Sequence, residues 1–255
     1  MITKLDYLLK LPFDFILEFS YLTSLVKLNN NYFTKLDYIN RLIKSLTLND
    51  CININNYYDD GLSCKEISYK YLYNYPNAII LKKEFYRYLS LLNEDVGYFI
   101  YEVPIPSSRV DIARIKNKSY AYEIKSKRDN TKRLKKQLEA MNDIFEISYI
   151  IIGEGLAINF DLDNVGVYKY HTTDEEITFN LEKEALINND IDPNKQLSLF
   201  DLKNLVHLYT NYFDETPKTS GRDCLLDIIS EKCPPDFIND QFKHMLMTRQ
   251  QTIHV

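Results

Sequence analysis

The chain has 255 residues, of which 45% are hydrophobic, and this composition suits one α/β domain with appendages or two small domains. Its four cysteines, at positions 51, 64, 224 and 233, have neither CxxC spacing nor nearby histidines, which argues against a zinc site and favours a reduced, cytoplasmic protein. Five charged residues interrupt the first 19 positions, so neither a signal-peptide core nor a membrane span is expected there.

Residues 1–75 are predicted to form a helical N-terminal region, because apolar residues recur at a helical period through residues 5–22 and 38–46. The polar stretch at residues 49–61, NDCININNYYDDG, is predicted to be a loop. No candidate catalytic or metal-binding residues are identified in this region. It is expected to cap a sheet, to form a homodimer or to help select a substrate, and these alternatives stay open.

A helix is predicted over residues 77–92 (NAIILKKEFYRYLSLL), because its apolar residues form one broad arc. Glu84 falls inside that arc. A carboxylate among apolar neighbours is costly unless a cation or a hydrogen-bond donor meets it. Either a metal site beneath the helix or a lysine at its rim would supply this partner.

A strand is predicted over residues 96–105 and two more within residues 109–127 (RVDIARIKNKSYAYEIKSK), where β-branched and aromatic residues dominate. Side chains alternate across a strand, so Glu123 and Lys125 share one face. A two-residue loop would turn Asp111 to the other face, whereas a three-residue loop would pair it with Glu123 or Lys125. We predict the three-residue loop, which brings the two carboxylates and the ammonium group together.

Two carboxylates and an ammonium group on one face suit phosphodiester hydrolysis. Oxygen ligands bind Mg²⁺ or Mn²⁺, and such a cation neutralises the charge that builds on a phosphoryl group under attack. Lys125 would orient or activate the attacking water. The spacing alone is weak evidence, because about one or two such matches arise by chance in a chain rich in lysine and glutamate.

The following segment supports the same site. A helix is predicted over residues 131–146 (TKRLKKQLEAMNDIFE), capped by Asp129 or Asn130, with Gln137 inside its apolar arc. Strands are predicted at residues 147–152 and 165–170. The order is therefore helix, three strands, helix, strand.

This order resembles the PD-(D/E)xK superfamily of restriction-endonuclease-like phosphodiesterases. It is similar to the RecB-type subgroup, which adds a glutamine on the following helix, and especially to small bacterial members with an E-I-K-S third strand. The matching residues are Glu84, Asp111, Glu123, Lys125, Asp129, Arg133, Leu134, Gln137 and Leu138. Val110 replaces the proline of the superfamily name, and Met141 stands where the subgroup has tyrosine.

The resemblance implies an α/β (α+β) fold with a restriction-endonuclease-like core over residues 76–190. A central mixed sheet flanked by helices would carry helical appendages at residues 1–75 and 191–255. The resemblance also implies roles for site residues. Asp111, Glu123 and the Ile124 carbonyl would bind Mg²⁺ (or Mn²⁺), Lys125 would serve the water, Glu84 would complete the acidic site, and Gln137 would steady the substrate or Lys125.

Positive charge is concentrated near the predicted site. Residues 114–136 contain ten lysines or arginines against two acids, in a chain whose net charge is −5. Such a patch is expected to face phosphates. The candidate nucleic-acid contacts are Arg114, Lys116, Lys127, Arg128 and Arg133. The expected partner is DNA, with RNA as the alternative.

The C-terminal region is predicted to contain helices near residues 200–212, 222–231 and 236–250. Just before them, QLSLF at residues 196–200 resembles the peptide by which bacterial polymerases and repair proteins dock on the DNA sliding clamp. Leu199 and Phe200 would fill a pocket, Gln196 would fix the orientation, and the preceding polar loop would make the peptide reachable. Alternatively, Ser198 caps an ordinary helix with a buried leucine stripe.

The predicted function is that of a metal-dependent nuclease, most favourably one that cleaves DNA, in repair, recombination or conflict between cells, phages and mobile elements. Two alternatives stay open. One is a catalytically inactive DNA-binding or adaptor protein, which could dock on the sliding clamp. The other is a defence effector that its helical flanks hold inactive until a trigger arrives.

Overall fold

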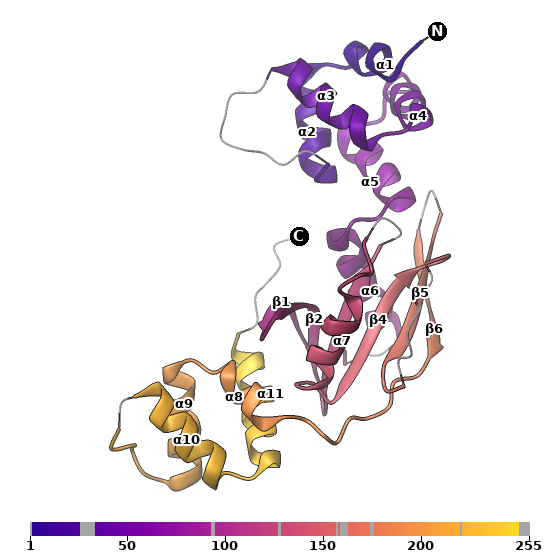
Figure 1. Ribbon diagram of the computed structural model, residues 1–255. Helices are drawn as coiled ribbons and strands as arrows, with labels where there is room; N and C mark the ends of the chain where they lie inside the picture. Colours follow the sequence, from indigo (N-terminus) through magenta and orange to yellow (C-terminus); the bar gives the residue numbers. More distant parts are fainter. Residues whose placement is uncertain are drawn as a thin grey trace. The chain divides into compact units, whose positions relative to one another are not determined.

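The computed structural model describes residues 2–25, 34–92, 95–126, 129–156, 158, 163–173, 176–219 and 221–249. The chain divides into two compact units, one of Met1–Glu84 with His171–Thr178 and the other of Phe85–Tyr170 with Phe179–Val255. The helix α6 (Ala78–Leu92) contains the boundary between them (Figure 1). Each unit has its own hydrophobic core.

The first unit is helical, as the apolar periodicity predicts. Its helices before α6 are α1 (Lys4–Lys10), α2 (Phe13–Thr23), α3 (Lys35–Ser45), α4 (Leu48–Asp59) and α5 (Cys64–Asn74). The predicted loop at residues 49–61 is wrong, because α4 occupies most of it. A capping box of Thr47 and Asp50 starts this helix, and Cys51 and Ile54 bury one side of it in the core.

A repeated pentapeptide links two helices of this unit. The sequence Thr-Lys-Leu-Asp-Tyr occurs at residues 3–7 and again at residues 34–38, and each copy starts a helix with a capping box. Lys4 Nζ donates to the carbonyls of Ile43 (3.0 Å) and Leu46 (2.5 Å) at the C-terminal end of α3. Lys35 Nζ donates to the carbonyl of Leu9 (2.9 Å) in the last turn of α1. Each copy therefore caps the helix that the other copy begins.

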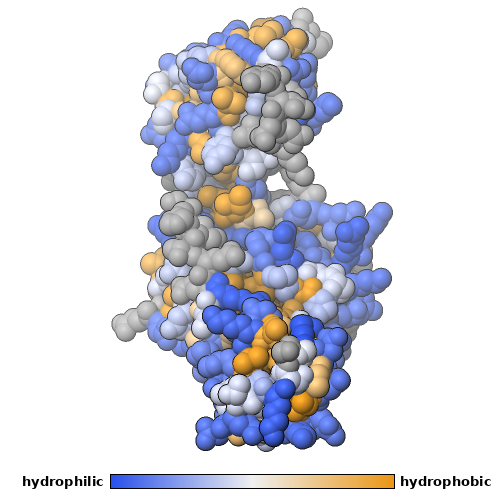
Figure 2. All heavy atoms as spheres, turned by 90° about the vertical axis from the view of Figure 1, so that its left-hand side faces the viewer, coloured by the Kyte–Doolittle hydropathy of each residue, from blue (hydrophilic) through white to orange (hydrophobic). Residues whose placement is uncertain are grey.

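Apolar side chains also reach the surface of this unit. The helix α2 exposes Phe13, Leu17 and Tyr21, which follow one another at four-residue intervals and so share one side of the helix. Orange patches among the blue surface of the N-terminal helices, in the upper part of Figure 2, show this mixture. The buried side of α2 carries Ile16 and Phe19 instead.

The second unit is built on a six-stranded mixed sheet with the order β1-β2-β3-β4-β5-β6. Its strands are β1 (Tyr98–Ile105), β2 (Ser108–Ile115), β3 (Ser119–Lys125), β4 (Ile147–Gly153), β5 (Gly166–Thr172) and β6 (Ile177–Lys183). The first three strands form an antiparallel meander, whereas β3, β4 and β5 run parallel. The predicted strands and the mixed sheet are confirmed, and β6 is an addition.

Helices flank this sheet. The helix α7 (Leu134–Asn142) connects the parallel strands β3 and β4, and it lies in front of the sheet in Figure 1. Its buried residues Leu134, Leu138 and Met141 share a core with the sheet. The rings of Phe85 and Tyr122 lie 5.1 Å apart, in an aromatic cluster that joins α6 to the sheet. A mixed α/β fold with a central sheet flanked by helices is therefore confirmed.

The C-terminal helices are α8 (Pro193–Ser198), α9 (Leu202–Phe213), α10 (Arg222–Lys232) and α11 (Pro235–Thr248). The last three confirm the predicted helices, whereas α8 was not predicted. They share the core of the sheet, where the rings of Phe145 and Phe242 meet edge to face at 5.5 Å. In the part of the chain that the structure describes, no helix is both long and apolar enough to cross a membrane.

Replacing Lys4 by alanine is expected to lower the free energy of unfolding by about 1 kcal/mol, because the last carbonyls of α3 lose a charged hydrogen-bond donor. The control is Lys44→Ala, which removes an exposed lysine from the last turn of the same helix and should change stability by only about 0.3 kcal/mol. Urea unfolding measures both. If both variants lose the same free energy of unfolding, Lys4 does not cap α3 in the way described.

Candidate active site

The β2–β3 hairpin has the register that the sequence predicted. Ile115 pairs with Ser119, which leaves a three-residue loop at residues 116–118, and the Lys116 amide donates to the Lys118 carbonyl at 3.0 Å. The prediction of a three-residue loop is confirmed. Because Ile112 pairs with Tyr122, the same register places the next residue, Asp111, opposite Glu123.

Asp111 lies where the regular strand pairing is interrupted. Its Oδ2 accepts a hydrogen bond from the Ile124 amide at 2.9 Å, so the side chain holds the backbone of β3. The regular pairs between β2 and β3 end at Ile112 and Tyr122. The carboxylate therefore sits at the point where the two strands stop pairing directly.

Glu123 is the most enclosed carboxylate of the predicted site, with only 2% of its surface exposed. Its Oε1 accepts from Lys125 Nζ at 2.6 Å and from Gln137 Nε2 at 2.8 Å. Its Oε2 is buried and has no hydrogen-bond partner among the described residues. A buried carboxylate oxygen without a donor is costly, and a bound cation would satisfy it.

The surroundings of Glu123 raise its pKa to about 7. Burial is the larger cause, and the negative charge of Asp111 adds to it, whereas Lys125 and Gln137 oppose the rise. Glu123 thus exchanges its proton near neutral pH. Such a group is poised to lose the proton when a cation arrives.

The donor set fits a hard divalent cation. Oxygen ligands suit Mg²⁺ and Mn²⁺, and Glu123 Oε2 together with Asp111 would supply them. Among the residues described here, no three His, Cys, Asp or Glu side chains form a ready metal-ligand group. The role of the Ile124 carbonyl as a further ligand stays a prediction.

Two helices carry the other predicted site residues. Gln137 lies on α7 and reaches Glu123 directly, so the structure brings it into the predicted group. Glu84 is buried on α6, one residue before Phe85, whose ring packs on Tyr122. Glu84 is grouped with the first compact unit, and its part in the acidic site stays a prediction.

The expected cap of α7 differs from the observed one. The helix starts later than predicted, with Arg133 at the N-cap and no side-chain cap. Asp129 instead accepts from the Ser126 amide at 2.7 Å and closes a turn after β3. Arg133 is exposed and stands four residues before Gln137, on the same side of the chain. Among the basic candidates, it is the one nearest to Gln137 in the sequence, and its role as a nucleic-acid contact stays a prediction.

The other basic candidates have different outcomes. Arg114 is 8% exposed, donates through Nε to the Val96 carbonyl at 2.7 Å and stacks on Tyr120, so its prediction as a nucleic-acid contact is wrong. Lys116 is exposed at the hairpin loop, five residues along β2 from Asp111, which is about 16 Å. Lys127 and Arg128 lie outside the described residues.

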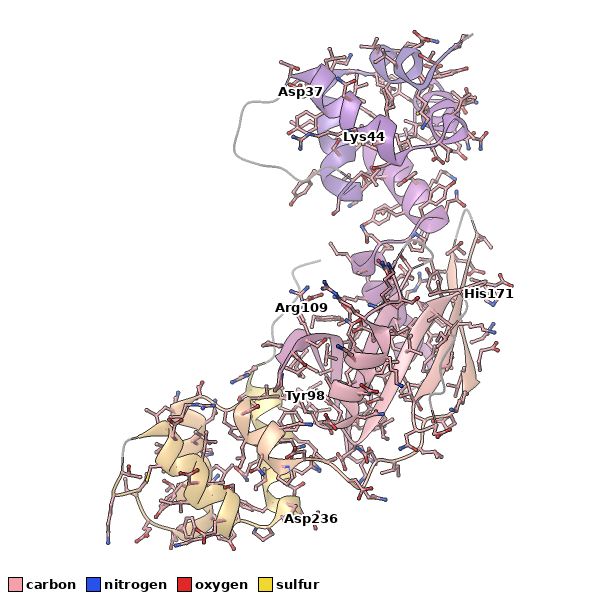
Figure 3. All side chains as sticks on the ribbon, in the orientation of Figure 1. Asp37, Lys44, Tyr98, Arg109, His171 and Asp236 are labelled. Atoms are coloured by element: carbon pink, nitrogen blue, oxygen red, sulfur yellow. The ribbon has the colours of Figure 1, made fainter. Side chains whose placement is uncertain are left out.

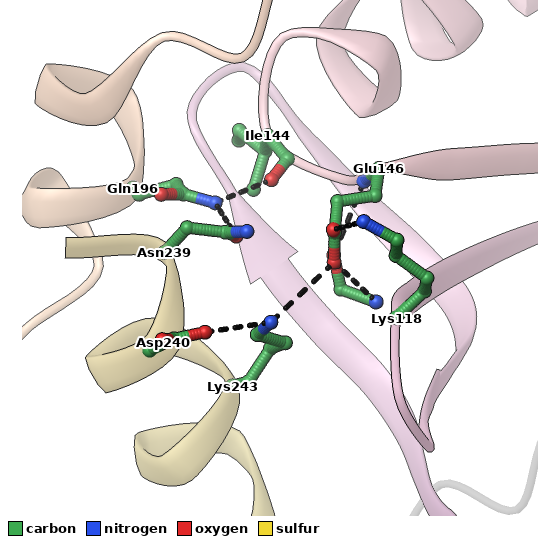
Figure 4. A network of polar contacts seen from close by, with 8 residues as sticks. Lys118, Ile144, Glu146, Gln196, Asn239, Asp240 and Lys243 are labelled. Carbon is green, nitrogen blue, oxygen red and sulfur yellow. Dashed lines mark hydrogen bonds and ion pairs between the residues drawn. The ribbon is translucent and has the colours of Figure 1, made fainter. Parts of the chain in front are cut away.

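The loop end of the hairpin is tied to the C-terminal helices. Glu146, just before β4, accepts from Lys118 Nζ (2.7 Å) and from the Ser119 amide (2.8 Å), and Lys243 of α11 lies 3.9 Å away (Figure 4). Burial acts to raise the pKa of Glu146, but these hydrogen bonds and charges outweigh it and hold that pKa below its usual range. Lys118 thus forms an ion pair within the protein, with Glu146.

The peptide predicted to dock on a sliding clamp is part of the core. Gln196 is 1% exposed and donates through Nε2 to the Ile144 carbonyl (2.9 Å) and to Asn239 Oδ1 (2.8 Å), as Figure 4 shows. Phe200 is buried and Leu199 packs against the same core. The prediction of a reachable peptide is wrong. The alternative cap is also wrong, because Asp201, not Ser198, caps α9.

Sequence reasoning missed an ion pair beside Asp111. Arg109 Nε lies 2.5 Å from Glu102 Oε2. Tyr101 pairs with Ile112 and Val103 with Val110, so the register places Glu102 opposite Asp111. Glu102 also has a left-handed backbone, with φ of 58°. The two-residue spacing of Arg109 and Asp111 was the only sequence signal, since it puts both on one face of a strand.

The raised pKa of Glu123 predicts how stability depends on pH. Between its ordinary value of 4.5 and about 7, the folded protein binds more protons at this carboxyl than the unfolded chain does, so stability falls as pH rises through this window. The wild type should lose up to about 3 kcal/mol from this group by pH 8. Glu123→Gln should remove that loss.

Chemical unfolding from pH 5 to pH 8 measures the difference between the two proteins. The matched control is Glu182→Gln, because Glu182 forms an exposed ion pair with Lys169 in the same unit. The control curve should run parallel to that of the wild type. A Glu123→Gln curve that also runs parallel would contradict the raised pKa.

Comparison with known proteins identifies the family. A family model described as bacteriophage P4 protein cII matches residues 82–254. No curated protein matches the sequence. A solved structure, the SPO1766 protein of unknown function from Silicibacter pomeroyi, is similar with a TM-score of 0.32 and 12% identity, over 69% of this chain and 94% of that chain. Since the family match spans well over half of the sequence and includes the whole sheet, the chain belongs to the bacteriophage P4 protein cII family.

Proposed function

We propose that this protein is a metal-dependent nuclease of the PD-(D/E)xK type that hydrolyses phosphodiester bonds, with DNA as its favoured substrate. The observation that carries the proposal is the environment of Glu123. It is a buried carboxylate with a lysine and a glutamine on one oxygen, no partner among the described residues on the other, and a second carboxylate on the adjacent strand. Structural ion pairs rarely leave a buried oxygen without a donor.

The arrangement of elements supports the same proposal. An antiparallel meander, a helix and a parallel strand follow one another as β1, β2, β3, α7 and β4, and the proposed core is restriction-endonuclease-like. The carboxylates occupy β2 and β3, and the glutamine occupies α7. Neighbouring elements thus deliver each group to one place.

In this proposal, Asp111, Glu123 and the Ile124 carbonyl hold Mg²⁺ or Mn²⁺. The cation would neutralise the charge that develops on the phosphoryl oxygens and would lower the pKa of a water molecule. Glu123 takes part only in its ionised form, so loss of its proton near pH 7 accompanies cation binding.

Lys125 and Gln137 arrange the reacting groups. The Lys125 ammonium, 2.6 Å from Glu123, is a hydrogen-bond donor that can orient the attacking water once the cation shares Glu123. Gln137 reaches Glu123 from α7 and fixes the orientation of that carboxylate. Glu84 would complete the acidic site from α6.

The partner in this proposal is the phosphate backbone of DNA, with RNA as the alternative. Arg133 is exposed and precedes Gln137 by four residues, so in this proposal it contacts a phosphate without rearrangement of the core. Lys116, Lys127 and Arg128 would extend the contact. Repair, recombination and conflict between phages and their hosts are the settings in which such an activity is used.

Cleavage assays on supercoiled plasmid and on end-labelled single- and double-stranded oligonucleotides should show cutting with Mg²⁺ or Mn²⁺ and none with a chelator. Asp111→Ala and Lys125→Ala should each lower the rate by at least about 100-fold, because each removes a group that acts on the reacting atoms. The ion-pair variant Lys169→Ala, on the exposed side of β5, should keep the wild-type rate.

A different result would favour the alternative function. If the folded wild type cuts none of these substrates and yet binds DNA without metal, and if Asp111→Ala and Lys125→Ala bind equally well, the protein is a catalytically inactive DNA-binding or adaptor protein. Circular dichroism of each variant shows that loss of cutting does not come from unfolding.

A further inference from the structure

An ion pair flanks the proposed site on the β1–β2 hairpin. Arg109 Nε lies 2.5 Å from Glu102 Oε2, and the two side chains are 65% and 39% exposed. The hairpin begins at Tyr98 and turns just before Ser108, so Arg109 belongs to its turn end, away from Tyr98 (Figure 3). The Arg109 side chain is therefore largely open to solvent, whereas Glu102 Oε2, the oxygen that faces it, is buried.

The register fixes where this ion pair stands. Glu102 on β1 lies opposite Asp111 on β2, and Asp111 lies opposite Glu123 on β3, so three carboxylates occupy one level across three neighbouring strands. Arg109 precedes Asp111 by two residues on β2. It therefore shares the face of Asp111, about 7 Å along the strand.

The backbone of Glu102 is held in an uncommon state. Its φ is 58°, in the left-handed region that side chains other than glycine rarely adopt. The regular pairs between β1 and β2 continue on both sides of Glu102. A residue kept in this state by its surroundings is typical of functional sites.

The geometry of the ion pair leaves Arg109 suited to a phosphate. Arg109 Nε lies 2.5 Å from Glu102 Oε2, and the Arg109 side chain is 65% exposed, so the N–H donors of its guanidinium group can be reached from solvent. An arginine presents such donors as a planar fork that matches two phosphate oxygens. An exposed cation is also what a polyanionic substrate requires next to two carboxylates that would otherwise repel it.

We propose that Arg109 binds a backbone phosphate next to the one that is cleaved, and that Glu102 positions its guanidinium group. This inference rests on the proposed nuclease function. It names a phosphate contact that the charge pattern did not select, on the strand that also carries Asp111. Arg109 is thus a substrate-binding residue and Glu102 a positioning residue.

Binding of a labelled duplex oligonucleotide tests Arg109. In a Lys125→Ala background, which should leave the substrate uncut, Arg109→Ala should weaken binding by about tenfold, the size of one charge-assisted hydrogen bond. The slope of log affinity against log salt should fall by about 0.9, as for one lost phosphate contact. Arg109→Lys should recover the salt slope but only part of the affinity, since lysine lacks the fork.

Steady-state cleavage with the otherwise wild-type chain tests the roles. Arg109→Ala should raise KM with little change in kcat, because the contact lies away from the reacting atoms. Glu102→Gln should raise KM by about threefold, and the double variant should match Arg109→Ala alone, because Glu102 acts through Arg109. The matched ion-pair controls, Lys169→Ala and Glu182→Gln, should change neither quantity.

The outcomes separate this inference from the proposed function. If the wild type cuts DNA and Lys125→Ala does not, but Arg109→Ala has wild-type KM and salt slope, the Arg109 contact is refuted and the nuclease stands. If the double variant is much worse than Arg109→Ala, Glu102 acts on its own and its positioning role is refuted. If the wild type neither binds nor cuts nucleic acid, both proposals fail together.

Discussion

The burial of Glu123 is the constraint on which the proposed site depends. A carboxylate that is taken out of water destabilises the fold unless donors replace the lost hydration. Lys125 and Gln137 both donate hydrogen bonds to Oε1 of Glu123, whereas Asp111 adds a second negative charge nearby. Burial and the charge of Asp111 outweigh the two donors, so the pKa of Glu123 is raised. The fold therefore keeps a group that is unfavourable for its own stability. Such a group persists where function needs it.

That burial is possible because the hairpin is fixed at its other end. The Glu146 side chain ties Lys118 and Ser119 to β4, and Lys243 of α11 adds a charge from the C-terminal helices. On one face of the sheet, the aromatic rings of Tyr122 and Phe85 fix α6 against β3. With its loop end and one face fixed, the hairpin can stop regular pairing at Asp111 without losing its register.

The central part of the fold could be predicted from the sequence because local signals and burial agreed there. Alternation along residues 109–127 identified both strands, and the three-residue loop followed from the need to put Asp111 on the face of Glu123. The helix α4 was missed because its asparagines suggested a loop, whereas its capping box at Thr47 and its buried Cys51 decided the outcome. A capping box followed by apolar residues at a helical period predicts a helix more strongly than a polar composition predicts a loop.

Other errors came from tertiary contacts that no local pattern reveals. Arg114 has the charge of a phosphate contact, but the Val96 carbonyl and the Tyr120 ring engage it within the fold. The sequence around Gln196 matches a docking peptide, yet its side-chain amide donates hydrogen bonds to the Ile144 carbonyl and to Asn239 Oδ1. In both cases a backbone carbonyl from a distant part of the sequence accepts a hydrogen bond from the side chain, which is therefore held within the fold. Gln137 was identified because a glutamine inside the apolar arc of a helix needs a polar partner, and the structure supplies Glu123 as that partner.

The interruption of pairing around Asp111 has a physical logic of its own. A continuous ladder uses every backbone amide and carbonyl, so it leaves none for a ligand. At the level of Asp111 the regular pairs lapse on both sides of β2, because Glu102 turns left-handed on one side and the Asp111 carboxylate takes the Ile124 amide on the other. The register then puts Glu102, Asp111 and Glu123, one carboxylate on each of three strands, at the level where the backbone pairing is interrupted. Backbone groups at such a level are open to side chains, as the hydrogen bond from the Ile124 amide to the Asp111 carboxylate shows.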